Sequence, residues 1–196
     1  MKPHVQILAW VARKERFDNI IAELTPTEPL ANRPNTMKPI AHLLHGYMGS
    51  GKTTFARQLE RECGAVRISH DEWMVRLHGW NPPEEHFSEF RAQVDNLIWD
   101  EAARVIGAGT DVIMDHGFWT RESRDAARDR ARSVGAAAKF YDVLCPQEIM
   151  RARALDRSKS PKTDSLWIDG AGFDKLFAAF EPMQDDEPRI RVDGTK

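Results

Sequence analysis

The pattern of apolar and polar positions divides the chain near residue 38. Before that point, apolar side chains recur at roughly helical spacing, which predicts one amphipathic helix carrying Ile7, Leu8, Val11, Phe17, Ile20, Ile21 and Leu24. The segment TPTEPLANRPNTMKP follows, and its four prolines disfavour both helix and sheet, which predicts a linker. Residues 1–38 are therefore expected to be either an upstream extension or an accessory helix that packs on a domain formed by residues 39–196.

From Pro39 onward, short apolar runs alternate with longer amphipathic segments. The apolar runs predict strands at residues 40–45, 65–69, 111–115, 139–145 and 189–193. The amphipathic segments predict helices at residues 52–63, 86–109, 120–135, 146–157 and 173–180. This alternation is typical of an α/β fold, here a parallel five-stranded sheet with helices on both faces.

Composition narrows the class of protein. The 196 residues suffice for one domain, and 41% hydrophobic with 30% charged residues is typical of soluble globular proteins. A net charge of −2 argues against a protein that coats nucleic acid, and no apolar run approaches the roughly 18 residues of a membrane span. Cys63 and Cys145 lie far apart, which predicts free thiols in a reducing compartment. With no signal-peptide layout at the N-terminus, we expect a cytoplasmic protein without a membrane partner.

The segment HGYMGSGKTT, residues 45–54, carries the clearest chemistry. Gly46, Gly51, Lys52 and Thr53 satisfy the pattern G-x-x-x-x-G-K-[ST] between a predicted strand and a predicted helix. Glycines let successive backbone amides face a phosphate, and the following helix adds its positive N-terminus. Lys52 is expected to reach the β- and γ-phosphates of ATP, and the Thr53 hydroxyl to ligate Mg²⁺. The predicted nucleotide-binding residues are Gly46, Gly49, Ser50, Gly51, Lys52, Thr53 and Thr54.

Two carboxylates follow the second and third predicted strands, where ligands gather in open α/β sheets. Asp71 is expected to act as the base that takes a proton from an acceptor hydroxyl, or else to complement a helix start where Ser69 and Glu72 fit a capping box. Asp115 directly follows an apolar strand, which is the usual position of a carboxylate that holds Mg²⁺ in nucleotide-binding proteins. The alternative is that Asp115 is a solvent-exposed residue at the end of the strand.

Histidines and tryptophans lie beside these carboxylates in the sequence. His70 and His116 either position an acceptor or are ordinary polar residues, whereas His45 is expected to be structural. Trp73 and Trp119 are either core residues or walls of an acceptor pocket.

Two sets of arginines have different expected roles. Arg153 and Arg157 lie one helical turn apart beside the loop SKSPKTDS, which predicts a lid pair that neutralises charge during phosphoryl transfer; the alternative is a solvated helix face. A second set of arginines shares one helix face and alternates with acidic residues, which predicts ion pairing at the surface. This stripe consists of Arg121, Arg124, Arg128 and Arg132.

Together, the segments HGYMGSGKTTFARQL, ISHDEW, VIMDHGFW and IMRARALDR resemble the P-loop kinase-like ATP-binding proteins, a group that includes zeta toxins, chloramphenicol phosphotransferase and the kinase domain of polynucleotide kinase. The resemblance implies a phosphotransferase with a nucleotide-kinase-like sheet and a helical lid. Lys52 and Thr53 match the group's phosphate and magnesium residues, and Asp71 its base. Arg153 and Arg157 match the lid arginines.

One position departs from this group. In polynucleotide kinase an arginine follows the acidic residue by three positions, where this chain has Met74. We therefore expect an ATP- and Mg²⁺-dependent kinase that acts on a hydroxyl of a small molecule. The alternatives are a polynucleotide or RNA-end kinase and a regulatory module that binds ATP and hydrolyses it slowly.

Overall fold

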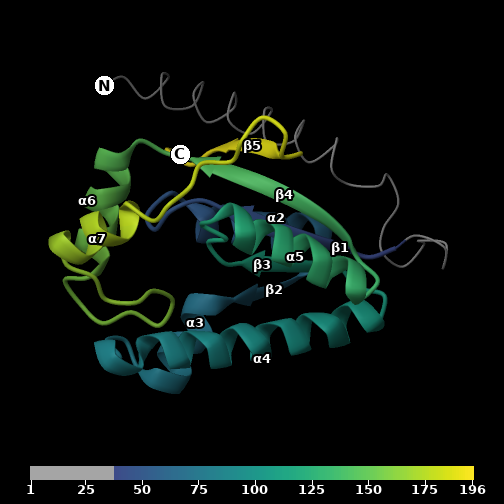
Figure 1. Ribbon diagram of the computed structural model, residues 1–196, viewed down its shortest axis with the longest axis horizontal. Helices are drawn as coiled ribbons and strands as arrows, with labels where there is room; N and C mark the ends of the chain where they lie inside the picture. The colour runs from purple at the N-terminus through teal and green to yellow at the C-terminus, as the bar shows by residue number, and fades with distance from the viewer. Residues whose placement is uncertain (1–37) are drawn as a thin grey trace.

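A computed structural model describes residues 38–196, so the helix and linker expected before residue 38 lie outside the described part. Five strands form one parallel sheet in the order β2-β3-β1-β4-β5 (Figure 1). The strands are β1 (Ile40–His45), β2 (Val66–Ser69), β3 (Val112–Asp115), β4 (Ala137–Leu144) and β5 (Ile190–Asp193). The predicted parallel five-stranded sheet is therefore confirmed.

Helices connect successive strands and also extend beyond the sheet. They are α2 (Lys52–Cys63), α3 (His70–His78), α4 (Phe87–Gly107), α5 (Arg121–Ser133), α6 (Gln147–Arg157) and α7 (Gly170–Phe177), with a short 3-10 turn at Glu84–His86. Helix α3 was expected only through the alternative role of Asp71, a helix start where Ser69 and Glu72 fit a capping box. The Ser69 half of that box is confirmed, since the Ser69 side chain accepts from the Glu72 amide at 3.4 Å.

Helices cover both faces of the sheet, as predicted. On one face, α4 and α5 bury apolar side chains against β1, β2 and β3, through Val94, Ile98, Ala102, Ile106, Ala127 and Ala131. On the other face, α2 packs Phe55, Ala56 and Leu59 against Leu44 and Tyr141. Each large side chain buried in this way contributes about 1.5–3 kcal/mol to folding.

A third apolar cluster lies at one end of the sheet. There α6 and α7 pack together (Figure 1), and Met150, Ala154 and Phe173 surround the fully buried Tyr47. Tyr47 also donates a hydrogen bond through its hydroxyl to the carbonyl of Phe173 at 2.7 Å. This cluster fixes the two C-terminal helices against the loop that follows β1. Within residues 38–196, no helix is both long and apolar enough to cross a bilayer.

The expectation that Arg124 belongs to a surface stripe is wrong. Its side chain is fully buried, and it donates to both carboxylate oxygens of Glu187, at 2.7 and 2.8 Å. The guanidinium also donates to the carbonyls of Trp119 and Glu181, at 3.2 and 3.0 Å. This set of acceptors makes burial of the charge possible, and it ties α5 to the segment before β5.

The other arginines of the stripe divide between surface and interior. Arg121 and Arg132 pair with acidic residues in solvent, as expected. Arg128 is mostly buried and lies over the ring of Phe140, with its guanidinium carbon 4.5 Å from the ring centroid. The cation–π contact replaces part of the hydration that this guanidinium loses.

Replacing Arg124 should therefore destabilise the fold strongly. Arg124→Met should lower the free energy of unfolding by about 3–5 kcal/mol, because it removes the main ion-pair partner of the buried Glu187 carboxylate and leaves Arg128, at 3.3 Å, to balance its charge. Arg132→Met removes an exposed partner of Asp129 and should cost about 1 kcal/mol or less. Urea unfolding of both variants measures the difference, and equal losses would contradict the structural role of the buried pair.

The Arg124–Glu187 pair should also make the stability of the fold depend on pH in the acid range. Burial acts to raise the pKa of Glu187, but hydrogen bonds from Arg124 and the Gln184 amide lower it from 4.5 to about 2. A depressed carboxylate pKa stabilises the fold above the ordinary value and loses that effect as the pH falls toward 2. The stability advantage of the wild type over Arg124→Met should therefore shrink below pH 4.5, as thermal melting across this range can measure.

Candidate active site

The glycine loop lies between β1 and α2 and has the backbone shape of a phosphate cradle. Gly46, Gly49 and Gly51 have φ angles of +150°, +82° and +102°, which side chains rarely allow. Helix α2 begins at Lys52 directly after the loop, and its first turn contains no acidic residue. The partial positive charge of the helix start is therefore left for an anion.

The backbone of two other segments presses against this loop. A Cβ atom on Gly49 would lie 2.3 Å from the carbonyl oxygen of Met150 in α6. On the other side, a Cβ atom on Gly194 would lie 1.8 Å from the carbonyl oxygen of Ser50. Both contacts require glycine, so the loop is held between α6 and the residue that follows β5. Sequence reasoning missed Gly194, because nothing near it in the sequence indicates so close an approach.

Lys52 turns back into the loop. Its ammonium donates to the carbonyl of Tyr47 at 2.9 Å. Burial lowers the pKa of Lys52 from 10.5 to about 8, although the charges of Asp115 and Asp71 act in the opposite direction. A phosphate would offer this partly buried ammonium a stronger partner than the carbonyl does.

Asp115 lies at the end of β3, beside the start of α2. Its side chain is only 2% exposed, it hydrogen-bonds with Thr53, and Arg67 donates to it at 3.1 Å. Burial raises the pKa of Asp115, and the charges of Lys52 and Arg67 oppose that rise. A carboxylate beside a hydroxyl is a set of hard oxygen ligands, so Thr53 and Asp115 fit Mg²⁺.

Arg67 is a site residue that sequence reasoning did not single out. It lies in β2, and besides Asp115 it contacts Glu72 at 2.6 Å and Glu60 at 3.7 Å. Its charge therefore balances three carboxylates on different elements. No local motif marks such a residue, because its partners come from α2, α3 and β3.

Asp71 lies in the first turn of α3 and is far more accessible than Asp115. Its side chain is 52% exposed. Partial enclosure acts to raise the pKa of Asp71, but the hydrogen bond and charge of His70 and the charges of Lys52 and Arg157 hold it below 3.8. The two carboxylates thus occupy different environments, one buried at a strand end and one ionised and open to a ligand.

The two arginines of α6 also have different surroundings. Arg153 donates to the carbonyls of Gly194 and Thr195, at 2.6 and 2.8 Å, and lies 3.4 Å from the carbonyl of Gly49. Arg157 has a buried Nε atom without a hydrogen-bond partner in the described part of the chain. The charge of Arg157 acts on both Lys52 and Asp71, which places it beside the candidate site.

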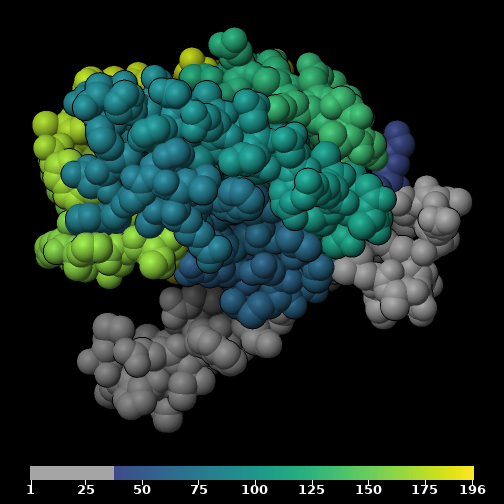
Figure 2. Space-filling view, turned by 90° about the horizontal axis from the view of Figure 1, so that it is seen from below, coloured from purple at the N-terminus to yellow at the C-terminus, as the bar shows by residue number. Residues whose placement is uncertain are grey.

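Helices α6 and α7 and the loop between them form the region predicted as a helical lid. The loop, residues 158–169, reaches α2 through an ion pair between Asp164 and Arg57 at 3.0 Å. It also joins the connection between α3 and α4, where the Trp167 amide donates to the Trp80 carbonyl at 2.9 Å. In Figure 2 this yellow-green segment lies directly beside the blue α3–α4 region. The lid region therefore spans the elements that carry Lys52 and Asp71.

Histidines next to the two carboxylates face each other. The rings of His70 and His116 stack with centroids 4.6 Å apart, and burial lowers the pKa of His116 well below 6.5.

His45 is fully buried, lies 3.1 Å from the Phe118 carbonyl, and has its pKa lowered by burial to about 4. These surroundings agree with the structural role expected for His45.

The two tryptophans proposed as pocket walls pack into different clusters. Trp73 packs against the core cluster that includes the apolar residues of α4 and α5, whereas Trp119 lies against Tyr47 with ring centroids 4.9 Å apart. Among the predicted nucleotide-binding residues, Ser50 is buried and Thr54 is exposed on α2. The structure thus brings together the glycine loop, both carboxylates and Arg157 at the carboxyl end of the sheet.

Comparisons with known proteins agree with this arrangement. A family model described as an AAA domain, AAA_33, matches residues 42–183. A candidate kinase from Chloroflexus aurantiacus has a TM-score of 0.66 at 17% identity, over 81% of this chain and 90% of that one. A comparison with curated proteins found no match.

Two further solved structures share the fold. A chain of the Pnkp1/Rnl/Hen1 RNA repair complex gives a TM-score of 0.61 at 22% identity, over 76% of this chain and 46% of that one. A gluconokinase from Sinorhizobium meliloti gives 0.55 at 15% identity, over 81% and 85%. At these identities the likeness shows the fold, which is P-loop kinase-like.

The lowered pKa of Lys52 predicts a pH-dependent affinity for ATP. The ammonium must be charged to pair with phosphate, so affinity should fall above pH 8, on the order of tenfold per pH unit at most. Calorimetric titration in buffers of different ionisation enthalpy should show proton uptake on binding in the same range. Lys52→Arg should abolish both effects, because arginine stays protonated. A flat wild-type profile would contradict the assignment.

Proposed function

Because the chain belongs to the AAA_33 family of AAA domains and has a P-loop kinase-like fold, we propose that it is a kinase that transfers the γ-phosphoryl group of ATP to a hydroxyl of a small molecule. The observation that carries this proposal is the contrast between two carboxylates at the same end of the sheet. Asp71 is 52% exposed and Asp115 is 2% exposed. One is open to an acceptor, and the other is enclosed with the Thr53 hydroxyl.

In this mechanism the glycine loop and the start of α2 hold the phosphates, and Lys52 pairs with the β- and γ-phosphates. Thr53 and Asp115 would hold Mg²⁺, which neutralises phosphate charge when bound. Asp71 accepts the proton of the acceptor hydroxyl while the oxygen of that hydroxyl forms a bond to the γ-phosphorus. The bond between the γ-phosphorus and the oxygen that bridges the β- and γ-phosphates breaks, and ADP leaves.

A second candidate function is phosphorylation of a nucleic-acid end, which the likeness to a chain of an RNA repair complex favours. Two observations count against it. The net charge is −2, and Met74, which occupies the place of the arginine in the polynucleotide kinase pattern, is fully buried in the core. Met74 therefore cannot contact a nucleic acid from that position. Because gluconokinase and a sugar kinase share the fold, sugars are the first acceptors to test.

The test is an ADP-release screen over sugars, aminoglycosides, nucleosides and RNA ends, with two variants. Asp71→Asn should lower acceptor-dependent turnover by about 10²–10⁴ and leave ATP affinity within a few-fold, because a base acts on the acceptor. Lys52→Ala should abolish turnover in a folded protein.

Other outcomes would identify different functions. ATP binding without any acceptor-stimulated ADP release would favour the regulatory module. If Asp71→Asn abolished ATP binding and Asp115→Asn slowed only the transfer, the two carboxylate roles would be reversed.

The different surroundings of the α6 arginines predict different kinetic effects. Arg157→Ala should lower kcat much more than it raises the Kd for ATP. The Arg157 guanidinium acts electrostatically on Lys52, and its Nε has no hydrogen-bond partner within residues 38–196, so it can act on transition-state charge. Arg153→Ala should instead weaken ATP binding and lower the melting temperature, because Arg153 ties the glycine loop to Gly194. Arg151, which pairs with Asp174 in solvent, provides a control on the same helix. Equal kinetic effects of all three substitutions would contradict this division.

A further inference from the structure

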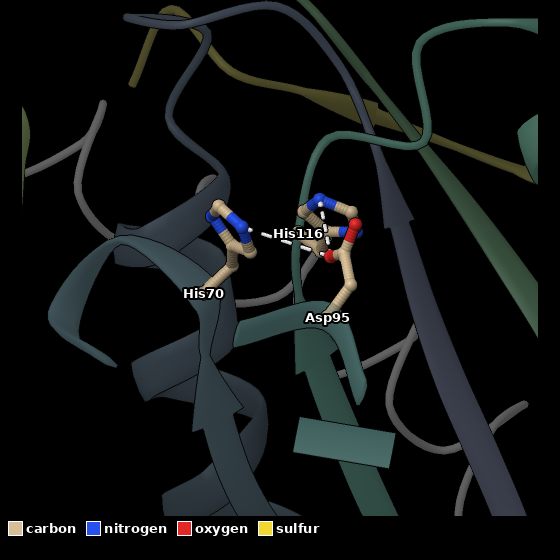
Figure 3. Close-up of side chains that lie close together, drawn as sticks. All are labelled: His70, Asp95 and His116. Atoms are coloured by element: carbon tan, nitrogen blue, oxygen red, sulfur yellow. Dashed lines mark ion pairs between the residues drawn. The ribbon is translucent and has the colours of Figure 1, made fainter. Parts of the chain in front are cut away.

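Three side chains converge beside the candidate active site, from three separate elements (Figure 3). His70 lies at the start of α3, His116 directly after β3, and Asp95 in α4. The Nε2 atom of each histidine lies 3.6 Å from the same atom, Oδ1 of Asp95. One potential ligand atom from each residue lies within 4.8 Å of the other two.

These distances do not fit direct hydrogen bonds. An N–H···O hydrogen bond in a protein spans about 2.7–3.2 Å between the heavy atoms. Ligand atoms that each lie about 2.0–2.1 Å from a tetrahedral Zn²⁺ ion are instead about 3.3–3.4 Å apart. The spacing of 3.6 Å around Asp95 is therefore close to that of ligands around one ion.

Two of the polar atoms that face each other are also buried without partners. Within residues 38–196, His70 Nε2 and Asp95 Oδ1 have no hydrogen-bond partner, and His70 is only 5% exposed. An unsatisfied buried polar group costs about 1–3 kcal/mol. A bound cation would satisfy the atoms that face each other across the cluster.

We propose that His70, Asp95 and His116 form a binding site for a divalent transition-metal ion of the Zn²⁺ type, separate from the Mg²⁺ site at Thr53 and Asp115. Two imidazoles and one carboxylate suit such an ion, whereas Mg²⁺ is bound through oxygen ligands. The carboxylate of Asp71 lies 3.3 Å from Nδ1 of His70. A second carboxylate of this kind orients a metal-bound histidine and strengthens it as a ligand.

The position of this site indicates what the ion does. Three protein ligands leave one position of a tetrahedral ion for water or for an oxygen atom of a substrate. His70 is the neighbour of Asp71, so the ion lies on the side of the proposed base and not within the glycine loop. The ion binds an oxygen donor of the acceptor, such as a hydroxyl or carboxylate group. This last step rests on the proposed function, whereas metal binding does not.

Metal binding can be measured without any enzymatic assay. The untagged full-length protein, stripped with a chelator, should bind one equivalent of Co²⁺ in the presence of excess Mg²⁺ and develop the visible absorption of a four-coordinate site. Zn²⁺ should displace the Co²⁺ and raise the melting temperature. Asp95→Asn and His116→Ala should each weaken Co²⁺ binding by at least tenfold and abolish the thermal shift.

Matched variants separate this site from other cation sites. His86→Ala removes an exposed histidine that lies beside Glu89, away from the cluster, and it should leave Co²⁺ binding unchanged. Thr53→Val should weaken Mg²⁺-dependent ATP binding and also leave the Co²⁺ spectrum unchanged. Circular dichroism establishes that each variant is folded. If His116→Ala is unstable, Asp95→Asn still tests the site, because asparagine has nearly the same shape as aspartate.

Two results would overturn the proposal. The first is a wild-type protein that shows neither a Co²⁺ spectrum nor a thermal shift with Zn²⁺. The second is wild-type Co²⁺ affinity in a folded Asp95→Asn variant. Either result would leave the proposed kinase function intact, because acceptor-dependent ADP release with Mg²⁺ alone tests that function separately.

Discussion

The close approach of backbone to backbone around the glycine loop is the constraint on which the candidate site depends. Amide groups can face a phosphate only if Gly46, Gly49 and Gly51 keep positive φ angles that cost a side chain about 1–2 kcal/mol each. Here the shape is enforced from outside, by the carbonyl of Met150 on one side and by Gly194 on the other. Arg153 links these supports by donating to carbonyls of both the tail and the loop. Helix α6 and the segment after β5 therefore belong structurally to the candidate phosphate site.

Charge balance is the second organising feature of the site. Lys52, Arg67 and Arg157 lie among carboxylates from three different elements, and each affects the protonation of its neighbours. Burial dominates for Lys52 and Asp115, so each is held nearer to neutrality than it would be in water. Asp71 is ionised more readily because cations surround it on an open side. The same end of the sheet thus holds one buried carboxylate beside the Thr53 hydroxyl and one exposed carboxylate that stays ionised.

The sequence was sufficient to predict the features that depend on local pattern. The alternation of strands and helices, the glycine loop and the carboxylates at two strand ends follow from short motifs, because periodicity and turn chemistry are local properties. Arg124 shows where this reasoning fails. Its neighbours in α5 resemble those of a solvated helix, and only the distant Glu187 makes its burial favourable. Asp95 was missed for the same reason, since it looks like any polar position on a long helix.

The contact between Gly194 and Ser50 has a consequence for the order in which the protein becomes functional during its synthesis. The loop is made early, yet one of its two supports is made only when the ribosome has added residue 194, after all five strands. A nascent chain therefore lacks a fully shaped phosphate cradle until its sheet is complete. Completion of the sheet and completion of the loop's second support therefore coincide late in synthesis.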